Sequence, residues 1–346
     1  MFFTNVQKSN EGEDSSVAES PDLFKLIHTS LPLLSSRNMS IWIFKAILQK
    51  VISFLPFSQQ INFFFQKYIT KGVILSDEYF EDRLLHCREH FKNFRKYNST
   101  VYFSCLEIGT GWYPVVPLGY FLYGAKSITT VDLVRLSNGK LIGETFSKFL
   151  EYHKKGKLEI LLPGILNERL LILLEEAENP TRDFYAVLDK HLITYMVMDA
   201  RKLHLPNNSV DLITSNNTFE HVDCNALEGI LIVFKKMLKV GGVMSHAIDL
   251  SDHFAHMDKS ITIYNFLKFS QSQWSLIDNS IQPQNRMRIY DYRNVYKKLS
   301  IPINEEISRE FILDDYRKVK VDEAFLLHSE QENAVSHSTL ISVGLE

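Results

Sequence analysis

The spacing of hydrophobic residues changes once along the chain, near Val101. Before that point, apolar residues recur every three or four positions, which predicts helices across residues 22–99. After it, short apolar runs alternate with segments of helical spacing, a pattern typical of an α/β domain with a parallel sheet. We therefore expect a helical N-terminal segment over residues 22–99 and an α/β domain over residues 100–346. The polar residues 1–21 are expected to form a disordered tail.

The helix predicted over Ile41–Leu55 is amphipathic. Its apolar face carries Phe44, Leu48, Val51 and Leu55, and its narrow polar stripe carries Lys45, Gln49 and Ser53. Two lysines interrupt the apolar run and Pro56 ends it, so we do not expect a membrane-spanning helix. Two interpretations stay open: the helix packs against the following domain, or residues 41–67 touch a membrane as an interfacial helix.

A second helix is predicted to begin at Asp77, which would cap its N-terminus. Its apolar positions are Phe80, Leu84, Cys87, Phe91 and Phe94, and charged residues occupy the opposite face. The pattern indicates either a helix that packs on the α/β domain or a lid over a ligand pocket.

Six apolar runs in the second part predict strands. They are Val101–Ile108, Ser127–Leu133, Thr194–Met198, Val210–Ser215, Val243–Ile248 and Ser338–Leu345. A helix is expected from Pro114, and another from Asp223 to the Gly241-Gly242 pair, which would end it. The leucine-rich stretch Lys157–Lys190 predicts a helical insertion between the second and third strands.

Composition narrows the class of protein. The formal net charge of −3 and the pI near 6.5 give no general attraction to nucleic acid, so we do not expect a nucleic-acid partner. The three cysteines are widely separated and form no CxxC pair, which favours a reducing compartment over a disulfide framework. The N-terminus lacks the features of a secretory signal, and the expected location is cytoplasmic, with the option of peripheral membrane contact.

A glycine-rich turn, EIGTGWYP, follows the first predicted strand. Gly109 and Gly111 let a ligand approach the backbone, and the next helix would offer free N–H donors. A dinucleotide-binding loop requires glycine where this chain has Pro114, whereas proline suits the first turn of a helix. Two glycines alone are compatible with several nucleotides.

Acidic residues at three successive strand ends make the prediction more specific. Glu107 precedes the glycines and could bind a cationic amine. Asp132 ends the second strand, 132 − 107 = 25 residues later, where a carboxylate can accept both hydroxyls of a ribose. Asp199 ends the third strand, where it could accept the exocyclic amine of adenine.

Four segments resemble, in order, the motifs of class I S-adenosylmethionine-dependent methyltransferases: LEIGTG, VDL, MDARKLHLPNNSVDLITSNNTFEHV and LKVGGVM. The resemblance covers about residues 101–250. It implies a Rossmann-like, doubly wound and mostly parallel sheet of seven strands. It also implies S-adenosylmethionine as cofactor, bound by Glu107, Gly109, Thr110, Gly111, Asp132, Leu133, Asp199, Ala200 and Asn216. Glu220-His221 matches the family's EH pair, whereas Tyr113 replaces a glycine that many members carry.

A polar segment after the fifth strand, SHAIDLSDHFAHMD, holds the candidates for handling the methyl acceptor. His246, Asp249 and His253 form the predicted general-base region. His253 and His256, three residues apart, could instead share a metal, and a solvated loop is the third interpretation. We assign no metal site from the sequence. An anionic group of the acceptor could be bound by Asn285, Arg286, Arg288 and Tyr290, although the two arginines could instead form surface salt bridges.

The sequence therefore predicts transfer of a methyl group to an oxygen or nitrogen of a small-molecule or glycan-like acceptor. An NPPY motif and paired cysteines are both absent from the sequence, which argues against amide or adenine N-methylation and cysteine-based RNA methylation. Two alternatives stay open. A nicotinamide-dependent oxidoreductase would share the fold, although Pro114 and Glu107 argue against it. A non-catalytic, cofactor-binding interaction protein would use the aromatic N-terminal segment as its docking surface.

Overall fold

The computed structural model describes residues 40–55, 74–309 and 311–345. The predicted tail and most of the residues that join the two N-terminal helices lie outside the described residues. The helices are α2 (Ile41–Ser53), α4 (Asp77–Tyr97), α5 (Val115–Leu122), α6 (Gly139–Lys154), α7 (Leu158–Leu161), α8 (Asn167–Glu178), α9 (Phe184–Lys190), α10 (Cys224–Met237), α11 (Gln271–Ile277), α12 (Ile289–Lys298), α13 (Leu313–Arg317) and α14 (Glu330–Ala334). Short 3₁₀ helices are η1 (Ala200–Lys202), η2 (Phe219–His221), η3 (His253–His256), η4 (Asn265–Lys268) and η5 (Glu323–Phe325).

Seven strands form one sheet in the order β3-β2-β1-β4-β5-β7-β6. They are β1 (Ser104–Ile108), β2 (Ser127–Asp132), β3 (Ile193–Val197), β4 (Val210–Asn216), β5 (Leu238–Asp249), β6 (Glu305–Ser308) and β7 (His337–Val343). β1 to β5 are parallel, whereas β7 runs antiparallel between β5 and β6. This architecture confirms the predicted seven-stranded, mostly parallel, doubly wound sheet. β6 was missed because this short edge strand, EEIS, is partly exposed and carries no apolar run.

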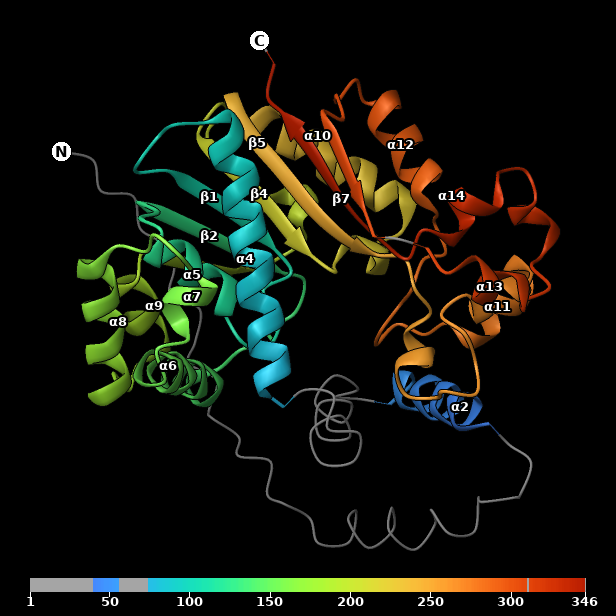
Figure 1. The fold of residues 1–346 in the computed structure, drawn as a ribbon, viewed down its shortest axis with the longest axis horizontal. Helices are drawn as coiled ribbons and strands as arrows, with labels where there is room; N and C mark the ends of the chain where they lie inside the picture. Colours follow the sequence, from blue (N-terminus) through green and yellow to red (C-terminus); the bar gives the residue numbers. More distant parts are fainter. Residues whose placement is uncertain (1–39, 56–73, 310, 346) are drawn as a thin grey trace, which may run out of the picture.

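The two faces of the sheet bury separate apolar clusters. One cluster lies beneath α4 to α9 and takes Cys105, Leu212 and Val243 from the strands. The other lies beneath α10 and α12 and takes Leu106, Ile213 and Met244. Figure 1 shows α4 crossing one face of the sheet, with α10 behind the strands. Side chains alternate between the faces, so each strand contributes to both clusters.

A third apolar cluster lies beside the main sheet and includes α2. Trp42 packs against Phe254 and Phe269, with ring centroids 5.9 Å apart in both pairs. The Asp258 carboxylate accepts hydrogen bonds from the Ser40 hydroxyl and the Trp42 N–H, at 2.7 and 3.1 Å. The described part of the N-terminal segment is therefore joined to the loops that follow β5.

α2 packs through a different face from the predicted one. Trp42, Ala46, Gln49 and Ile52 are buried, whereas Val51 and Leu55, expected inside, are exposed. The surface that receives α2 is apolar around Trp42 but offers polar partners further along the helix: Gln49 Nε2 donates to Gln282 Oε1 at 3.2 Å, and Lys50 Nζ donates to the Asp278 carbonyl at 2.6 Å. Gln49, a member of the predicted polar stripe, thus helps to pack the helix.

α4 packs on the domain, as one of the two interpretations expected. Phe80, Leu84, Cys87 and Phe94 are fully buried in the cluster beneath it. The cap is one residue earlier than predicted, because the Ser76 side chain accepts a hydrogen bond from the Tyr79 N–H while Asp77 lies in the first turn.

The prediction that Gly241-Gly242 ends a helix is wrong. α10 ends at Met237, and β5 begins immediately at Leu238 and includes both glycines. Gly241 has a φ of +70°, and its N–H donates to the Gly344 carbonyl at the end of the sheet. The start of α10 agrees with the prediction, since the Asp223 side chain accepts from the Ala226 N–H. The predicted insertion at residues 157–190 contains α7, α8 and α9.

Candidate functional site

The carboxyl ends of β1, β2 and β4 bring predicted cofactor-binding residues together on one face of the sheet. Glu107 pairs with Thr130 and Thr214 in the sheet register, so the three side chains share a face. Asp132 and Asn216, each two residues further along, lie on that same face. The Glu107, Asp132 and Asn216 side chains are all buried.

The turn between β1 and α5 requires its first glycine. Gly109 has a φ of +82°, and its N–H donates to the Val131 carbonyl at 2.9 Å. A Cβ on Gly109 would lie 2.2 Å from the Thr218 hydroxyl oxygen, so that a side chain does not fit. Gly111 has a φ of +74° but open space where its Cβ would be. The backbone of this loop is therefore free to approach a ligand at Gly111.

Glu107 is held by two polar neighbours. The Thr130 hydroxyl donates to Oε2 at 3.2 Å, and Asn216 Nδ2 donates to Oε1 at 3.4 Å. Burial, and then the negative charge of Asp132, raise the pKa of Glu107 to about 8. A cationic group bound here would favour the ionised form, because an opposite charge lowers the pKa of a buried carboxyl.

Asp132 lies beside the glycine-rich turn. The Gly111 N–H donates to Oδ1 at 3.4 Å, and the Tyr195 hydroxyl donates to Oδ2 at 3.0 Å. Burial raises the pKa of Asp132 to about 7 despite these hydrogen bonds. The Thr110 hydroxyl contacts the Thr130 hydroxyl, so Thr110 connects the turn to the Glu107 contacts.

The residues expected beside the adenine differ in their exposure and in their contacts. Ala200 is buried, whereas Leu133 is 74% exposed. The Asp199 carboxylate accepts from the Arg201 Nε at 2.9 Å and pairs with its Nη2 at 2.5 Å. This hydrogen bond with Arg201 keeps the pKa of Asp199 below its usual value. A ligand amine would have to share Asp199 with Arg201.

α4 contributes a residue to this site that the sequence did not predict. His90 is fully buried, with Nδ1 2.7 Å from the Ser245 hydroxyl and Nε2 2.9 Å from Asn216 Oδ1. Because an amide oxygen only accepts, Nε2 carries the hydrogen and Nδ1 accepts from Ser245. Burial lowers the pKa of His90 to about 3, which keeps the ring neutral. A polar chain thus runs from Ser245 through His90 and Asn216 to Glu107. In the sequence, the sign of this contact is that His90 lies four residues before Phe94, on the apolar side of the predicted helix.

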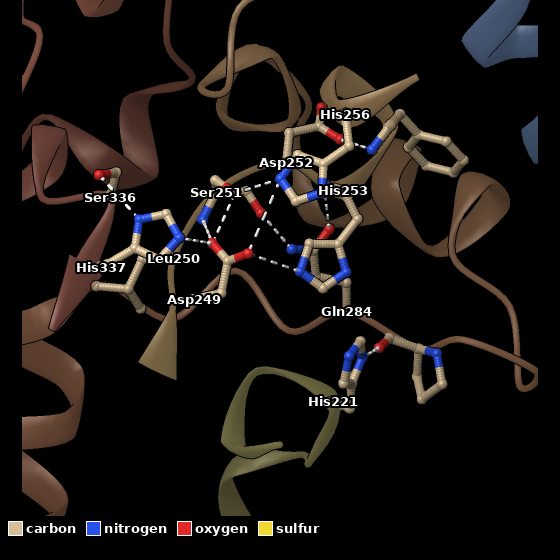
Figure 2. A network of polar contacts seen from close by, with 12 residues as sticks. His221, Asp249, Leu250, Ser251, Asp252, His253, His256, Gln284, Ser336 and His337 are labelled. Carbon is tan, nitrogen blue, oxygen red and sulfur yellow. Dashed lines mark hydrogen bonds and ion pairs between the residues drawn. The ribbon is translucent and has the colours of Figure 1, made fainter. Parts of the chain in front are cut away.

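Asp249 is the centre of the histidine-rich segment after β5 (Figure 2). Its carboxylate accepts from the Ser251 N–H at 2.8 Å and from the Ser251 hydroxyl at 2.6 Å. The Nε2 atoms of His253, His256 and His337 lie 3.5, 3.9 and 3.4 Å from its oxygens. Despite burial, which acts the other way, the hydrogen bond with His253 and the neighbouring imidazoles hold the pKa of Asp249 well below its usual range.

His246 is separate from Asp249 and His253. It alternates with Ser245 on β5 and therefore faces the α10 side of the sheet, where its ring stacks on Phe219 at 4.4 Å. The side chain is fully buried, and burial lowers its pKa to about 3. Nδ1 contacts the Ser215 hydroxyl at 2.9 Å. The predicted general-base region is thus divided, and only Asp249 and His253 lie together.

The EH pair lies on η2, between β4 and the segment that contains His253. Neither carboxyl oxygen of the buried Glu220 makes a hydrogen bond of normal geometry within the described residues, and burial raises its pKa well above the usual value. His221 Nδ1 lies 2.5 Å from the Pro283 carbonyl, and its ring centroid lies 5.0 Å from that of His253. Burial lowers the pKa of His221 to about 4.

Arg286 and Arg288 donate mainly to backbone carbonyls, and the fully buried Arg288 fills neither role considered for it. Arg288 is fully buried; Nη1 donates to the Leu250 carbonyl, and Nη2 donates to the carbonyls of Asn333 and Val335. The Arg286 Nη1 donates to the Phe266 carbonyl at 3.2 Å. Both guanidinium groups therefore hold loops together, and Arg288 is closed to an acceptor.

Comparison with known proteins agrees with this geometry. The methyltransferase domain family matches residues 174–245. The match runs from the end of α8 into β5, and the sheet order is the one expected for a class I, S-adenosylmethionine-dependent methyltransferase. A search of curated proteins returned no match.

Solved structures resemble this chain at low sequence identity. Phosphoethanolamine N-methyltransferase 2 of Haemonchus contortus is 14% identical, with 75% of this chain and 52% of that chain covered and a TM-score of 0.41. The chain therefore spans about half the length of that enzyme. An S-adenosylmethionine-dependent methyltransferase of Methanosarcina mazei is 13% identical, with coverage of 72% and 96% and a TM-score of 0.40. A further one from Mesorhizobium loti is 13% identical, with coverage of 75% and 99% and a TM-score of 0.36.

The helices within the described ranges are each too short or too polar to cross a membrane.

Proposed function

We propose that this protein transfers a methyl group from S-adenosylmethionine to an oxygen or nitrogen of a small-molecule or glycan-like acceptor. One observation carries the proposal: Glu107 and Asp132 are buried together beside the Gly109 turn, at the carboxyl edge of the sheet. Ligands of open α/β sheets bind at this edge. Glu107 would receive the cationic amino group, and Asp132 would receive the ribose hydroxyls.

Asn216, Leu133 and Ala200 complete the proposed cofactor site. Asn216 would lie next to the sulfonium, because its side chain is fixed between Glu107 and His90. Leu133 would cover one side of the adenine, and Ala200 would contact the other. Asp199 would accept the adenine amine while keeping its contact with Arg201.

A small cavity of about 10 Å³ beside His253, large enough for a single water molecule, marks where we expect one hydroxyl group of the acceptor. Its lining combines α2 with the loops after β5: Lys45, Gln49, His253, Phe254, Trp274, Asp278, Asn279, Gln282 and Gln284. Amide side chains donate and accept hydrogen bonds, as hydroxyl-rich molecules require. Asp249 and His253 would take the proton that an acceptor hydroxyl loses.

Peripheral membrane contact remains a proposal for α2. Ile47, Val51 and Phe54 are exposed on the side of α2 that faces away from the domain, at 53%, 54% and 78%. An interfacial helix would bury such side chains among lipid headgroups. A cytoplasmic location is proposed on the composition alone.

Calorimetric titration tests the cofactor assignment. S-adenosylhomocysteine should bind and raise the melting temperature, whereas NAD should do neither. Stabilisation by NAD alone would support an oxidoreductase instead, and failure to bind either ligand would favour a non-catalytic interaction protein.

Incubation with a labelled methyl donor and a metabolite mixture tests the acceptor. Lys45→Ala should raise KM for the acceptor found and leave affinity for S-adenosylhomocysteine unchanged. Lys259→Ala, which removes an exposed lysine, is the matched control. An unchanged KM in Lys45→Ala would exclude this cavity as the acceptor site.

A further inference from the structure

Two short helices at the sheet edge bring three metal-binding side chains together. One carboxylate oxygen of Glu220 and one ring nitrogen each of His221 and His253 lie within 4.8 Å of one another. Glu220 and His221 belong to η2, after β4, and His253 begins η3, after β5. We propose that these three residues form a binding site for a divalent transition-metal cation.

The state of Glu220 points to a missing ligand. Its side chain is 1% exposed, and neither carboxyl oxygen makes a hydrogen bond of normal geometry within the described residues, although the backbone N–H groups of Glu220 and Asp249 lie near enough to act against the rise in its pKa. Burial of a polar group costs free energy unless a partner compensates for the lost water, and buried charges are paired or bind metals. A cation between Glu220 and the two imidazoles would supply that partner.

Both imidazoles are oriented by an acceptor on one ring nitrogen. His221 Nδ1 lies 2.5 Å from the Pro283 carbonyl, which can only accept, so Nδ1 carries the hydrogen and Nε2 presents its lone pair. His253 Nε2 lies 3.5 Å from Asp249 Oδ2, as Figure 2 shows. Metal-binding histidines in general direct their second nitrogen to a carbonyl or a carboxylate in this way.

The segment 283–285 fixes the two helices relative to each other. The Asn285 N–H donates to the Glu220 carbonyl at 2.7 Å, and its Nδ2 donates to the Phe219 and Val222 carbonyls at 2.8 and 2.7 Å. Gln284 Oε1 accepts from the His253 N–H at 3.3 Å. The three side chains are therefore held near one another without a ligand, which lowers the cost of ordering them on binding.

The ligand set selects a class of cation. Two imidazoles and one carboxylate suit Zn²⁺, Mn²⁺, Fe²⁺ or Co²⁺, whereas Mg²⁺ and Ca²⁺ prefer oxygen ligands alone. Three protein ligands leave at least one position open for water or for an oxygen of another molecule. This inference goes beyond the proposed methyl transfer, because a sulfonium donor needs no metal. A bound cation would hold and polarise a hydroxyl of the acceptor, and because it would occupy the lone pair of His253, Asp249 alone would then take the proton.

Metal titration of the full-length, chelator-treated protein tests the proposal. Co²⁺, followed by its visible absorption, and Zn²⁺, followed by calorimetry, should each bind as a single equivalent, and Mg²⁺ should bind much more weakly. Glu220→Gln, His221→Ala and His253→Ala should each abolish this binding. His153→Ala is the matched control and should leave the metal binding unchanged. His153 is also paired with a carboxylate, that of Glu159, but this pair is exposed and lies away from the proposed site.

The outcomes separate this proposal from the cofactor assignment. Each variant is also titrated with S-adenosylhomocysteine, which should bind as before if only the metal site is lost. Absence of a tight equivalent in the wild type, or its persistence in Glu220→Gln, would overturn the proposal. If a variant does not fold, pulsed electron paramagnetic resonance of Mn²⁺ bound to ¹⁵N-histidine-labelled wild type decides: coupling to histidine nitrogen supports the site, and its absence overturns it.

Discussion

Gly109 and Thr218 come so close together that a side chain cannot fit between them. A Cβ on Gly109 would lie 2.2 Å from the Thr218 hydroxyl oxygen and 2.8 Å from its methyl carbon. Thr218 is itself fixed, because its hydroxyl lies 3.1 Å from the Asn216 carbonyl and 3.3 Å from the Ile108 carbonyl. The contact couples the turn after β1 to the end of β4, the two segments proposed to hold the methionine part of the cofactor.

Gly109→Ala should therefore weaken cofactor binding strongly. An alanine that keeps the φ of +82° costs about 1–2 kcal/mol, because this φ is left-handed, and its methyl group would also have to displace Thr218. Calorimetry with S-adenosylhomocysteine measures the loss. Gly139→Ala, at the start of α6 and with open space at its Cβ position, should bind normally. Equal affinity in both variants would contradict the proposed position of the cofactor.

Asp132→Ala should lower affinity for S-adenosylhomocysteine without unfolding the protein. Loss of a charged hydrogen-bond acceptor costs about 1.5–3 kcal/mol, which corresponds to an affinity about 10–150-fold lower. Calorimetry and a melting curve measure the two effects separately. Asp314→Ala removes an exposed acid from α13 and serves as the control. Unchanged affinity in Asp132→Ala would refute the ribose assignment.

Glu107 should make the ligand-free protein less stable as the pH rises. Burial raises its pKa from 4.5 to about 8, so the folded state retains a proton that the unfolded state has lost. The stabilising contribution is complete below pH 4.5 and is lost as the pH rises through about 8. The melting temperature should fall across this window, and Glu107→Gln should flatten the profile.

Glu178→Gln, which changes an exposed glutamate on α8, is the control for that experiment and should leave the profile as it is. Affinity for the cationic cofactor should follow the opposite course in the wild type and rise with pH, because the ionised carboxylate binds it. A Glu107→Gln profile as steep as that of the wild type would show that another group titrates.

His246→Ala and His253→Ala should have different effects. His246 packs between Phe219 and Phe234, so its loss leaves a cavity and should lower the melting temperature. His253 is partly exposed beside Asp249, so its loss should lower kcat while affinity for S-adenosylhomocysteine stays unchanged. A lower kcat with normal stability in His246→Ala would restore His246 to the catalytic group.

Arg288→Met should destabilise the fold. The substitution leaves the carbonyls of Leu250, Asn333 and Val335 without their donor, at a cost of about 1–3 kcal/mol for each buried group. Chemical denaturation measures the change in the free energy of unfolding. Arg182→Met removes an exposed arginine and should change it little. A stable Arg288→Met variant would show that water replaces the guanidinium.

The spacing of hydrophobic and acidic residues along the chain determined most of the strands and the position of the candidate cofactor site. The strands, the turn and the acids at the strand ends follow from local periodicity, and parallel strands bring their carboxyl ends to one edge. Even the separation of His246 from Asp249 is present in the two-residue period of β5, since positions 246 and 249 point to opposite faces. The edge strand β6 gave too weak a pattern to be found.

Only the tertiary structure decided which surfaces meet. Gln49 and Lys50 of α2 face inward because residues more than 200 positions away offer amide and carbonyl partners, and no helical pattern contains that information. The contact of His90 with Asn216 and the approach of His253 to Glu220 and His221 arise for the same reason. Hydrophobic spacing specifies which residues are buried, whereas the partner of a buried polar group is set by the packing of distant segments.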